Sequence, residues 1–400
     1  MTELDQNFLS ISRTLAQFEH YWRESPYQVQ QPRWMQSNPS LAQQCLNLTD
    51  SQLPLLEANP EALQQWLAPH LPGVDALLSR VEPDWASQRP VALPSHWHVG
   101  IPGRKKTQIE KFAQCFTPMQ PHLIDWCCGK GHLGRTLAHA HELTASGLEI
   151  NPQLCAVGET ARGGKAPVMV LHQTDVLDDQ ALARVAAALP HGSHAVALHA
   201  CGDLHRRLVQ WAAAENLPAL SLVPCCYPLW LKHKTFAPLS ALAQQHDLGL
   251  TRDDLNLAVQ EVVTASAKQQ QQLFQLNAWR LGFDQLQRDC TGRDEYLATP
   301  SLPKSALGWG FKAVCQHLAR ARNIQLPSDS QWHHYQQQGE LRWRQVRRLQ
   351  LVSQGFRRLL ELWLLHDLAL CLRQGGYHVA LSRFCEREIT PRNLLINAKR

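Results

Sequence analysis

The sequence predicts an α/β fold in which helices cover both faces of a parallel sheet. Five short apolar runs alternate with stretches compatible with helices, as parallel strands buried on both faces do. The first run meets the glycine cluster Gly129-Lys-Gly131-His-Leu-Gly134, and a helix-compatible segment follows. This strand, loop and helix order is typical of nucleotide-binding folds. The expected strands cover 123–127, 145–150, 167–174, 194–200 and 219–224.

The chain of 400 residues is too long for one compact core and predicts two or three domains. Proline turn signals and helix-compatible segments fill the first part, where we find no chemistry. The last part contains two strand-like runs, from Tyr377 to Phe384 and from Asn393 to Asn397, which we expect to pair as an antiparallel hairpin at the edge of the sheet. The four expected regions are a helical region (1–95), the sheet core (96–250), a helical, arginine-rich insertion (251–372) and the strands that complete the sheet (373–400).

Composition is that of a globular protein of the cytoplasm. Charged residues make up 18% and hydrophobic residues 44% of the chain, and the net charge of +5 is compatible with nucleic-acid binding. We predict no secretory signal, because the first five residues are acidic and no apolar segment follows them. The apolar stretch from Leu359 to Leu372 is too short and too charged to span a membrane. The 12 cysteines show no C-x-x-C spacing and indicate reduced thiols.

Three carboxylates follow the pattern of the strands. Asp125 lies inside the first strand, Glu149 ends the second, and Asp175 ends the third. An acid in the first strand suits an ammonium group, one after the second suits ribose hydroxyls, and one after the third suits the amino group of adenine. Together with Gly129 and Gly131 they describe S-adenosylmethionine better than a nicotinamide dinucleotide. The alternative for each acid is a helix cap or a solvated loop residue.

Longer motifs extend this pattern. They are Asp125-x-Cys-Cys-Gly-Lys-Gly-His-Leu-Gly134, Ala197-Leu-His-Ala-Cys-Gly-Asp203, Pro224-Cys-Cys-Tyr227 and the closing segment Phe384-Cys-x-Arg-x-Ile-Thr-Pro-Arg-Asn393. The chain resembles class I S-adenosylmethionine-dependent methyltransferases, in the branch of methyltransferase-like proteins and of the methyltransferase half of the glutathione-S-transferase-C-terminal-domain-containing protein. It is more distantly similar to a tRNA ribose methyltransferase family. The resemblance covers about 100–250 and 376–400.

The resemblance implies a Rossmann-like methyltransferase sheet of seven strands, with the helical insertion before the last two. It also implies a set of residues that hold S-adenosylmethionine. These are Asp125, Cys127, Cys128, Gly129, Gly131, Glu149, Asp175, Val176 and His199. One departure is that Cys127 stands where most class I enzymes have the first loop glycine.

Cysteines gather at the expected ends of the first, fourth and fifth strands: Cys127, Cys128, Cys201, Cys225 and Cys226. Three interpretations stay open. The thiols serve as small apolar groups that shape the pocket, or one thiolate attacks a pyrimidine ring, or they bind a metal or an iron–sulfur cluster. Because adjacent residues on a strand point to opposite faces, we predict no metal site.

We expect five residues to line the acceptor side: His199, Cys201, Asp203, Cys226 and Tyr227. His199 is a candidate base, with a structural hydrogen-bonded histidine as the alternative. Tyr227 is a candidate platform on which a flat acceptor stacks. Methyl transfer from a sulfonium mainly requires positioning, so a strong base is not essential.

A basic helix is expected over 338–372. Its buried stripe comprises Leu341, Leu349, Val352, Phe356, Leu359 and Trp363, and its arginines form a basic outer band. The expected RNA contacts are Arg342, Arg344, Arg347 and Arg348, joined by Arg104, Lys105 and Lys106 ahead of the first strand. The alternative is a solvated helix face whose arginines pair with Glu340 and Glu361.

The sequence therefore predicts an S-adenosylmethionine-dependent methyltransferase that acts on RNA, either tRNA or rRNA, at a base or a ribose oxygen. Two alternatives remain. One is a methyltransferase acting on a protein or a small molecule, and the other is a non-catalytic, cofactor-binding protein associated with RNA or the ribosome.

Overall fold

The chain forms two compact units in the computed structural model, which describes residues 1–93, 97, 100–160, 169–190, 192–231, 233–260, 267–327 and 331–400. The sheet unit comprises Met1–Ala16, Leu77–Gln260 and Arg358–Arg400, and the helical unit comprises Gln17–Ala76 and Glu261–Arg357. This division differs from the ranges expected from sequence. The first 95 residues contribute to both units, and the insertion ends at Arg357 rather than at residue 372.

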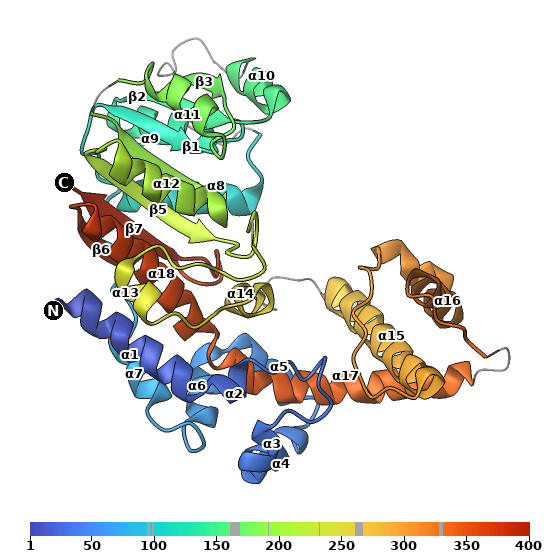
Figure 1. Ribbon diagram of the computed structural model, residues 1–400. Helices are drawn as coiled ribbons and strands as arrows, with labels where there is room; N and C mark the ends of the chain where they lie inside the picture. The colour runs from blue at the N-terminus through green and yellow to red at the C-terminus, as the bar shows by residue number, and fades with distance from the viewer. Residues whose placement is uncertain are drawn as a thin grey trace. The chain divides into compact units, whose positions relative to one another are not determined.

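The sheet unit is built on one sheet with the strand order β3-β2-β1-β4-β5-β7-β6 (Figure 1). Strands β1 to β5 are parallel, and β7 runs antiparallel to both β5 and β6. The strands are β1 (His122–Trp126), β2 (Thr144–Glu149), β3 (Met169–Gln173), β4 (His194–Cys201), β5 (Ala219–Cys225), β6 (His378–Arg383) and β7 (Leu394–Lys399). The five predicted parallel strands and the closing antiparallel hairpin are confirmed.

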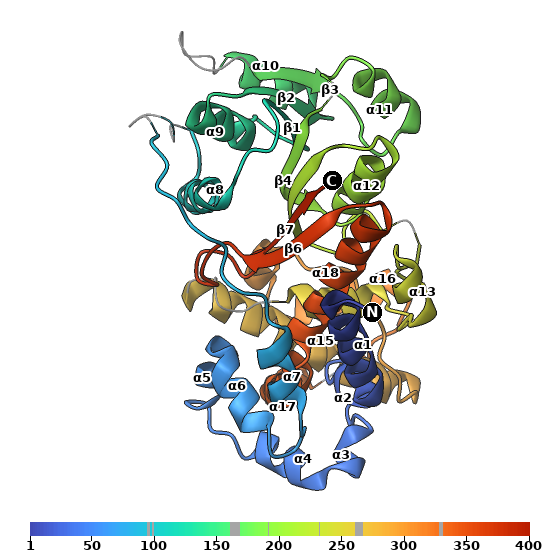
Figure 2. The same cartoon turned by 90° about the vertical axis from the view of Figure 1, so that its left-hand side faces the viewer.

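Helices cover both faces of this sheet, with α8 and α9 on one face and α11 and α12 on the other (Figure 2). Phe112 of α8 and Leu137 of α9 are buried in one cluster with Leu123, Val196 and Val223 of the strands. The helices of the unit are α1 (Glu3–Gln17), α7 (Val74–Val81), α8 (Gly103–Cys115), α9 (His132–His141), α10 (Pro152–Thr160), α11 (Asp179–Ala186), α12 (Asp203–Ala214), α13 (Ala241–Gln245), α14 (Arg252–Val259) and α18 (Arg357–Gln374).

The helical unit centres on two long helices, α15 and α17, which cross at two glycines. A Cβ on Gly339 would lie 2.1 Å from the Ala278 carbonyl oxygen, and one on Gly282 would lie 2.5 Å from that of Tyr335. Only glycine permits so close an approach of two backbones. The unit contains α2 (Glu19–Trp22), α3 (Trp34–Ser37), α4 (Pro39–Leu46), α5 (Leu53–Ala58), α6 (Pro60–Leu67), α15 (Ala267–Thr291), the 3₁₀ helix η1 (Lys304–Trp309), α16 (Phe311–Ala321) and α17 (Trp332–Gln354).

The prediction of a single helix over 338–372 is wrong. The structure has two helices here, α17 and α18, and the helical conformation is interrupted between them at Gly355. The Gly355 carbonyl accepts a hydrogen bond of 2.6 Å from the Gln64 side chain instead of continuing the helical ladder. The predicted buried stripe is correct except for Leu341, which is 51% exposed. Among the described residues, no helix has both the length and the apolar character needed to cross a membrane.

Candidate functional site

The glycine loop after β1 turns sharply through left-handed backbone conformations. Cys127, Gly129 and Gly131 have φ values of 55°, 60° and 72°. A Cβ on Gly131 would lie 2.9 Å from the Met169 sulfur, whereas one on Gly129 would meet nothing within 4 Å. The loop is therefore packed against β3 at Gly131 and open at Gly129, where a ligand can approach the backbone.

Glu149 fastens the end of β2 to this loop. Its carboxylate accepts hydrogen bonds of 2.9 Å from the backbone N–H groups of Gly129 and Asn151. Each oxygen accepts one of these bonds and keeps a lone pair for a further donor. The side chain is thus fixed at the position where the sequence predicts contacts to ribose hydroxyls.

Asp125 is placed differently from the prediction of a direct ammonium contact. Its residue is 2% exposed, and its carboxylate accepts a 2.8 Å hydrogen bond from the Gly134 N–H in the first turn of α9. Burial raises its pKa to about 7, opposed by the Gly134 hydrogen bond and the charge of Lys105. The buried Asp125 carboxylate therefore anchors the end of the glycine loop, at the first turn of α9, to β1.

Asp175 and Val176 follow β3 at the same edge of the sheet. The Asp175 carboxylate accepts a 2.9 Å hydrogen bond from the Leu177 N–H, and Val176 is buried. The Thr174 N–H donates to the Glu149 carbonyl at 2.8 Å and ties the two strand ends together. An acid and an apolar surface thus lie next to each other, as an adenine ring requires.

The ends of β4 and β5 are irregular and bring three thiols together. His199 has a φ of 73° at a register shift in β4, and Cys226 has a φ of 44° just after β5. The Cys201 sulfur lies 3.4 Å from that of Cys225, and the sulfurs of Cys201, Cys225 and Cys226 all lie within 4.8 Å of one another. We call these three residues the thiol cluster.

The thiols differ in their acidity. Hydrogen bonds from Cys201 and Cys225, helped by the charges of Arg392 and His199, hold the pKa of Cys226 far below its usual value. Burial and the charges of Glu149 and Asp125 instead raise the pKa values of Cys127 and Cys128. These surroundings therefore favour deprotonation of Cys226 over deprotonation of Cys127 or Cys128.

His199 faces α8 through a 2.6 Å hydrogen bond between its Nε2 and the Gln108 side-chain oxygen. Partial withdrawal from water and the nearby charge of Lys105 lower its pKa. Burial lowers the pKa of His132 to about 4, and the charges of Lys105, Arg135 and Lys130 reinforce this. Lys105 and Gln108 thus belong to the site. The sequence predicted an RNA contact for Lys105 and no role for Gln108.

Two residues expected on the acceptor side have other partners. Asp203 begins α12 and forms an ion pair of 3.2 Å with Arg206. Tyr227 is 2% exposed, and its ring meets that of His205 edge-on at 5.2 Å. The prediction that Tyr227 stacks on an acceptor is therefore wrong for this structure, because the ring faces the core.

Gly202 holds the ends of β4 and β5 in place. Its N–H donates to the Cys225 carbonyl at 3.0 Å, and a Cβ at this position would lie 1.8 Å from the Leu229 carbonyl oxygen. Its φ of 56° also favours glycine. The backbone conformation and the close contact with Leu229 therefore explain why the His-Ala-Cys-Gly-Asp motif has glycine at this position.

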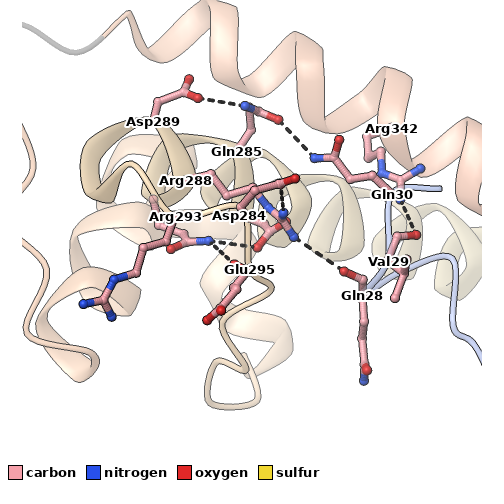
Figure 3. Close-up of polar contacts among 12 residues, drawn as sticks. Gln28, Val29, Gln30, Asp284, Gln285, Arg288, Asp289, Arg293, Glu295 and Arg342 are labelled. Carbon is pink, nitrogen blue, oxygen red and sulfur yellow. Dashed lines mark hydrogen bonds and ion pairs between the residues drawn. The ribbon is translucent and has the colours of Figure 1, made fainter. Parts of the chain in front are cut away.

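Most of the arginines expected to contact RNA through α17 have partners within the helical unit. Arg342 donates to the Val29 carbonyl (Figure 3) and also to the Pro26 carbonyl. Arg347 pairs with Glu57, and Arg348 pairs with Asp50 at 2.7 Å. Arg344 is exposed. Arg342, Arg347 and Arg348 are therefore engaged by acids and carbonyls of the N-terminal segment, whereas Arg358 pairs with Glu361 at 2.7 Å, as the alternative expected.

Part of the sheet unit matches a known protein family. Residues 104–232 match a family model described as a methyltransferase domain. A solved geranyl diphosphate methyltransferase in complex with GPP and sinefungin is 15% identical, with 42% of this chain and 66% of that chain covered and a TM-score of 0.23. No curated protein matches the chain. By its seven-strand order and by this family match, the sheet unit is similar to a methyltransferase domain.

Proposed function

We propose that the sheet unit transfers a methyl group from S-adenosylmethionine. The observation that carries the proposal is the Glu149 carboxylate, held on the Gly129 N–H with lone pairs to spare. The open backbone at Gly129 and the buried Val176 beside Asp175 also fit such a cofactor. Gly129 and Gly131 would hold its amino-acid part, Glu149 its ribose, and Asp175 with Val176 its adenine.

The bound cofactor supplies an electrophilic methyl group on a sulfonium, so the protein mainly has to position an acceptor in line with it. The acceptor side is formed by His199 and the half-buried Cys201 and Cys226. His199 is held by Gln108, and its lowered pKa keeps the imidazole neutral near pH 7, where it can take a proton. Asp203 supports this side through its ion pair with Arg206.

The acceptor that we propose is RNA. Lys105 and Lys130 lie close enough to His132 for their charges to act on it, and Arg104 is exposed beside them. These cations lie next to the glycine loop, so a phosphate backbone is attracted to the same edge of the sheet. This cluster belongs to the sheet unit and does not depend on the arginines of α17.

A second candidate acceptor is a protein or a small molecule. The observation that favours it is the internal pairing of Arg342, Arg347 and Arg348, which leaves α17 with few free cations among its described residues. On this alternative the arginines only stabilise the helical unit.

The test is methyl incorporation from tritiated S-adenosylmethionine into an extract of host cells that lack this protein. The extract is divided and treated with RNase or protease, and Glu149→Ala protein serves as the inactive control. Label lost only to RNase supports an RNA acceptor, and label lost only to protease supports a protein acceptor. Label in neither polymer, found instead among small molecules, contradicts the RNA proposal.

A further inference from the structure

The thiol cluster has the spacing of a metal site. Its three sulfurs lie within 4.8 Å of one another, with 3.4 Å between Cys201 and Cys225. Sulfurs bound at about 2.3 Å to one tetrahedral zinc ion lie about 3.8 Å apart. Small side-chain rotations therefore suffice to bring all three sulfurs onto one ion.

The backbone explains how adjacent cysteines reach one point. Cys225 and Cys226 would face opposite sides of a regular strand, which is why the sequence argued against a metal. In the structure, β5 ends at Cys225, and the left-handed conformation of Cys226 turns its side chain back toward its neighbour. The two side chains therefore do not point to opposite faces as they would on a regular strand.

A second backbone irregularity, in β4, brings Cys201 to the cluster. Its strand shifts register between Leu198 and Cys201, where His199 is left-handed, and Cys201 then pairs directly with Cys225. A left-handed conformation costs about 1–3 kcal/mol for residues other than glycine. Two residues in this conformation flank one group of three thiols, and the close contact of Gly202 with Leu229 holds the backbone there in place. Such a costly backbone indicates a functional arrangement rather than simple packing.

The surroundings leave one side of the cluster accessible. Cys225 is buried, whereas Cys201 and Cys226 are half-buried. Three thiolates and one divalent ion carry a net charge of −1, and Arg392 lies close enough for its charge to act on Cys226. Three protein ligands with a free fourth position are typical of catalytic rather than purely structural zinc.

We propose that Cys201, Cys225 and Cys226 bind one zinc ion and leave its fourth position open to water or to an atom of the acceptor. Soft thiolates select zinc over magnesium or calcium. The site lies at the ends of β4 and β5, beside the proposed cofactor edge formed by β1 to β3. Zinc binding does not depend on the proposed methyl transfer and is tested without cofactor or acceptor.

The experiment titrates the reduced, chelator-treated full-length chain with Zn²⁺ in competition with a chromophoric chelator, and in parallel with Co²⁺. We expect one ion per chain and a thiolate-to-cobalt charge-transfer band. Cys201→Ser, Cys225→Ser and Cys226→Ser should each weaken binding about 100-fold or more. Cys371→Ser is the matched control, since Cys371 is also half-buried in the sheet unit but lies outside the cluster.

Wild-type protein that binds neither ion, or that binds them as tightly after the three cluster substitutions together, would overturn the proposal. The cobalt spectrum of the wild-type chain decides the question even where a variant fails to fold, because thiolate charge transfer requires sulfur ligands. A spectrum with cobalt bound but no such band would also contradict it.

Discussion

Glu149 and Gly129 are joined by a 2.9 Å hydrogen bond that links the end of β2 to the loop after β1. The two residues lie twenty positions apart in the sequence, Glu149 at the end of β2 and Gly129 in the loop that follows the neighbouring parallel strand β1. Because the donor is the loop backbone, the bond fixes both the shape of the loop and the direction of the carboxylate. A ligand at this edge meets a preorganised acceptor, which lowers the cost of binding.

Glu149→Ala should therefore weaken the binding of S-adenosylmethionine about 10- to 100-fold, because a hydrogen bond to a charged group contributes about 1.5–3 kcal/mol. Isothermal titration calorimetry measures the affinity directly. Glu215→Ala, at an exposed acid after α12, is the control and should leave the affinity unchanged. An equally tight complex with Glu149→Ala would refute the assignment of the cofactor site.

Gly202→Ala should destabilise the sheet unit by roughly 3 kcal/mol or more, since its Cβ would lie 1.8 Å from a backbone oxygen that no rotamer change can remove. Urea unfolding measures the loss. Gly103→Ala is the control, because Gly103 lies at the start of α8, where a Cβ meets nothing within 4 Å. Equal stability of the two variants would show that the contact with Leu229 is not maintained in solution.

His194 should make the stability depend on pH. The ring is 2% exposed, its Nδ1 accepts from the Met119 N–H, and its Nε2–H donates to Ser221 at 3.0 Å. Burial lowers its pKa to about 3. Between pH 6.5 and about 3 the unfolded chain therefore binds a proton that the folded chain does not, so the free energy of unfolding falls as the pH falls through this range.

His194→Gln removes this contribution. Between pH 7 and pH 5 the variant should lose about 2 kcal/mol less unfolding free energy than the wild type, at about 1.4 kcal/mol per pH unit below 6.5. Urea titrations at the two pH values give the difference. His139→Gln, at an exposed position of α9, should lose as much as the wild type. A variant with the wild-type pH dependence would mean that His194 becomes protonated while folded.

Replacement by methionine should lower the free energy of unfolding strongly at Arg358 and hardly at all at Arg344. Arg358 is 7% exposed and pairs with Glu82 at 3.0 Å and with Glu361 at 2.7 Å. Its removal leaves the buried Glu361 and the half-buried Glu82 with only the more distant Arg392 and Arg383, and should cost about 3–5 kcal/mol. Arg344→Met, at an exposed site, should change the unfolding free energy by less than about 0.5 kcal/mol. Calorimetric or urea unfolding separates the two, and similar losses would contradict the burial of the Arg358 pairs.

The strands were predictable because parallel strands buried on both faces leave an unbroken apolar run, as in Ala195–Leu198 of β4. The glycine loop was predictable because its spacing is local. The partners of Arg347 and Arg348 were not, since Glu57 and Asp50 lie about 290 residues away in the sequence. The spacing of residues along a helix gives no sign of partners so distant in the sequence. From the sequence, these arginines were therefore expected to be available to RNA.

The thiol cluster could not be predicted from the sequence either, although its cysteines lie much closer together in the chain. The cysteines are visible in the sequence, but their convergence depends on the left-handed conformations of His199 and Cys226. Such conformations are uncommon for these residue types and carry no sequence signal of their own. The break at Gly355 likewise depends on a hydrogen bond from Gln64, far away in the chain.

The pairing of β5 with β7 also has a consequence for biosynthesis. After Cys225 leaves the ribosome, about 170 residues must be made before Leu394–Lys399 arrives, which takes about 10–35 s at 5–20 residues per second. During this interval the nascent chain exposes the unpaired edge of an apolar strand, which other chains can join. In the finished protein that hazard is moved to β6, whose outer edge is covered where Arg383 bonds to the backbone of Asp84 and Ala86.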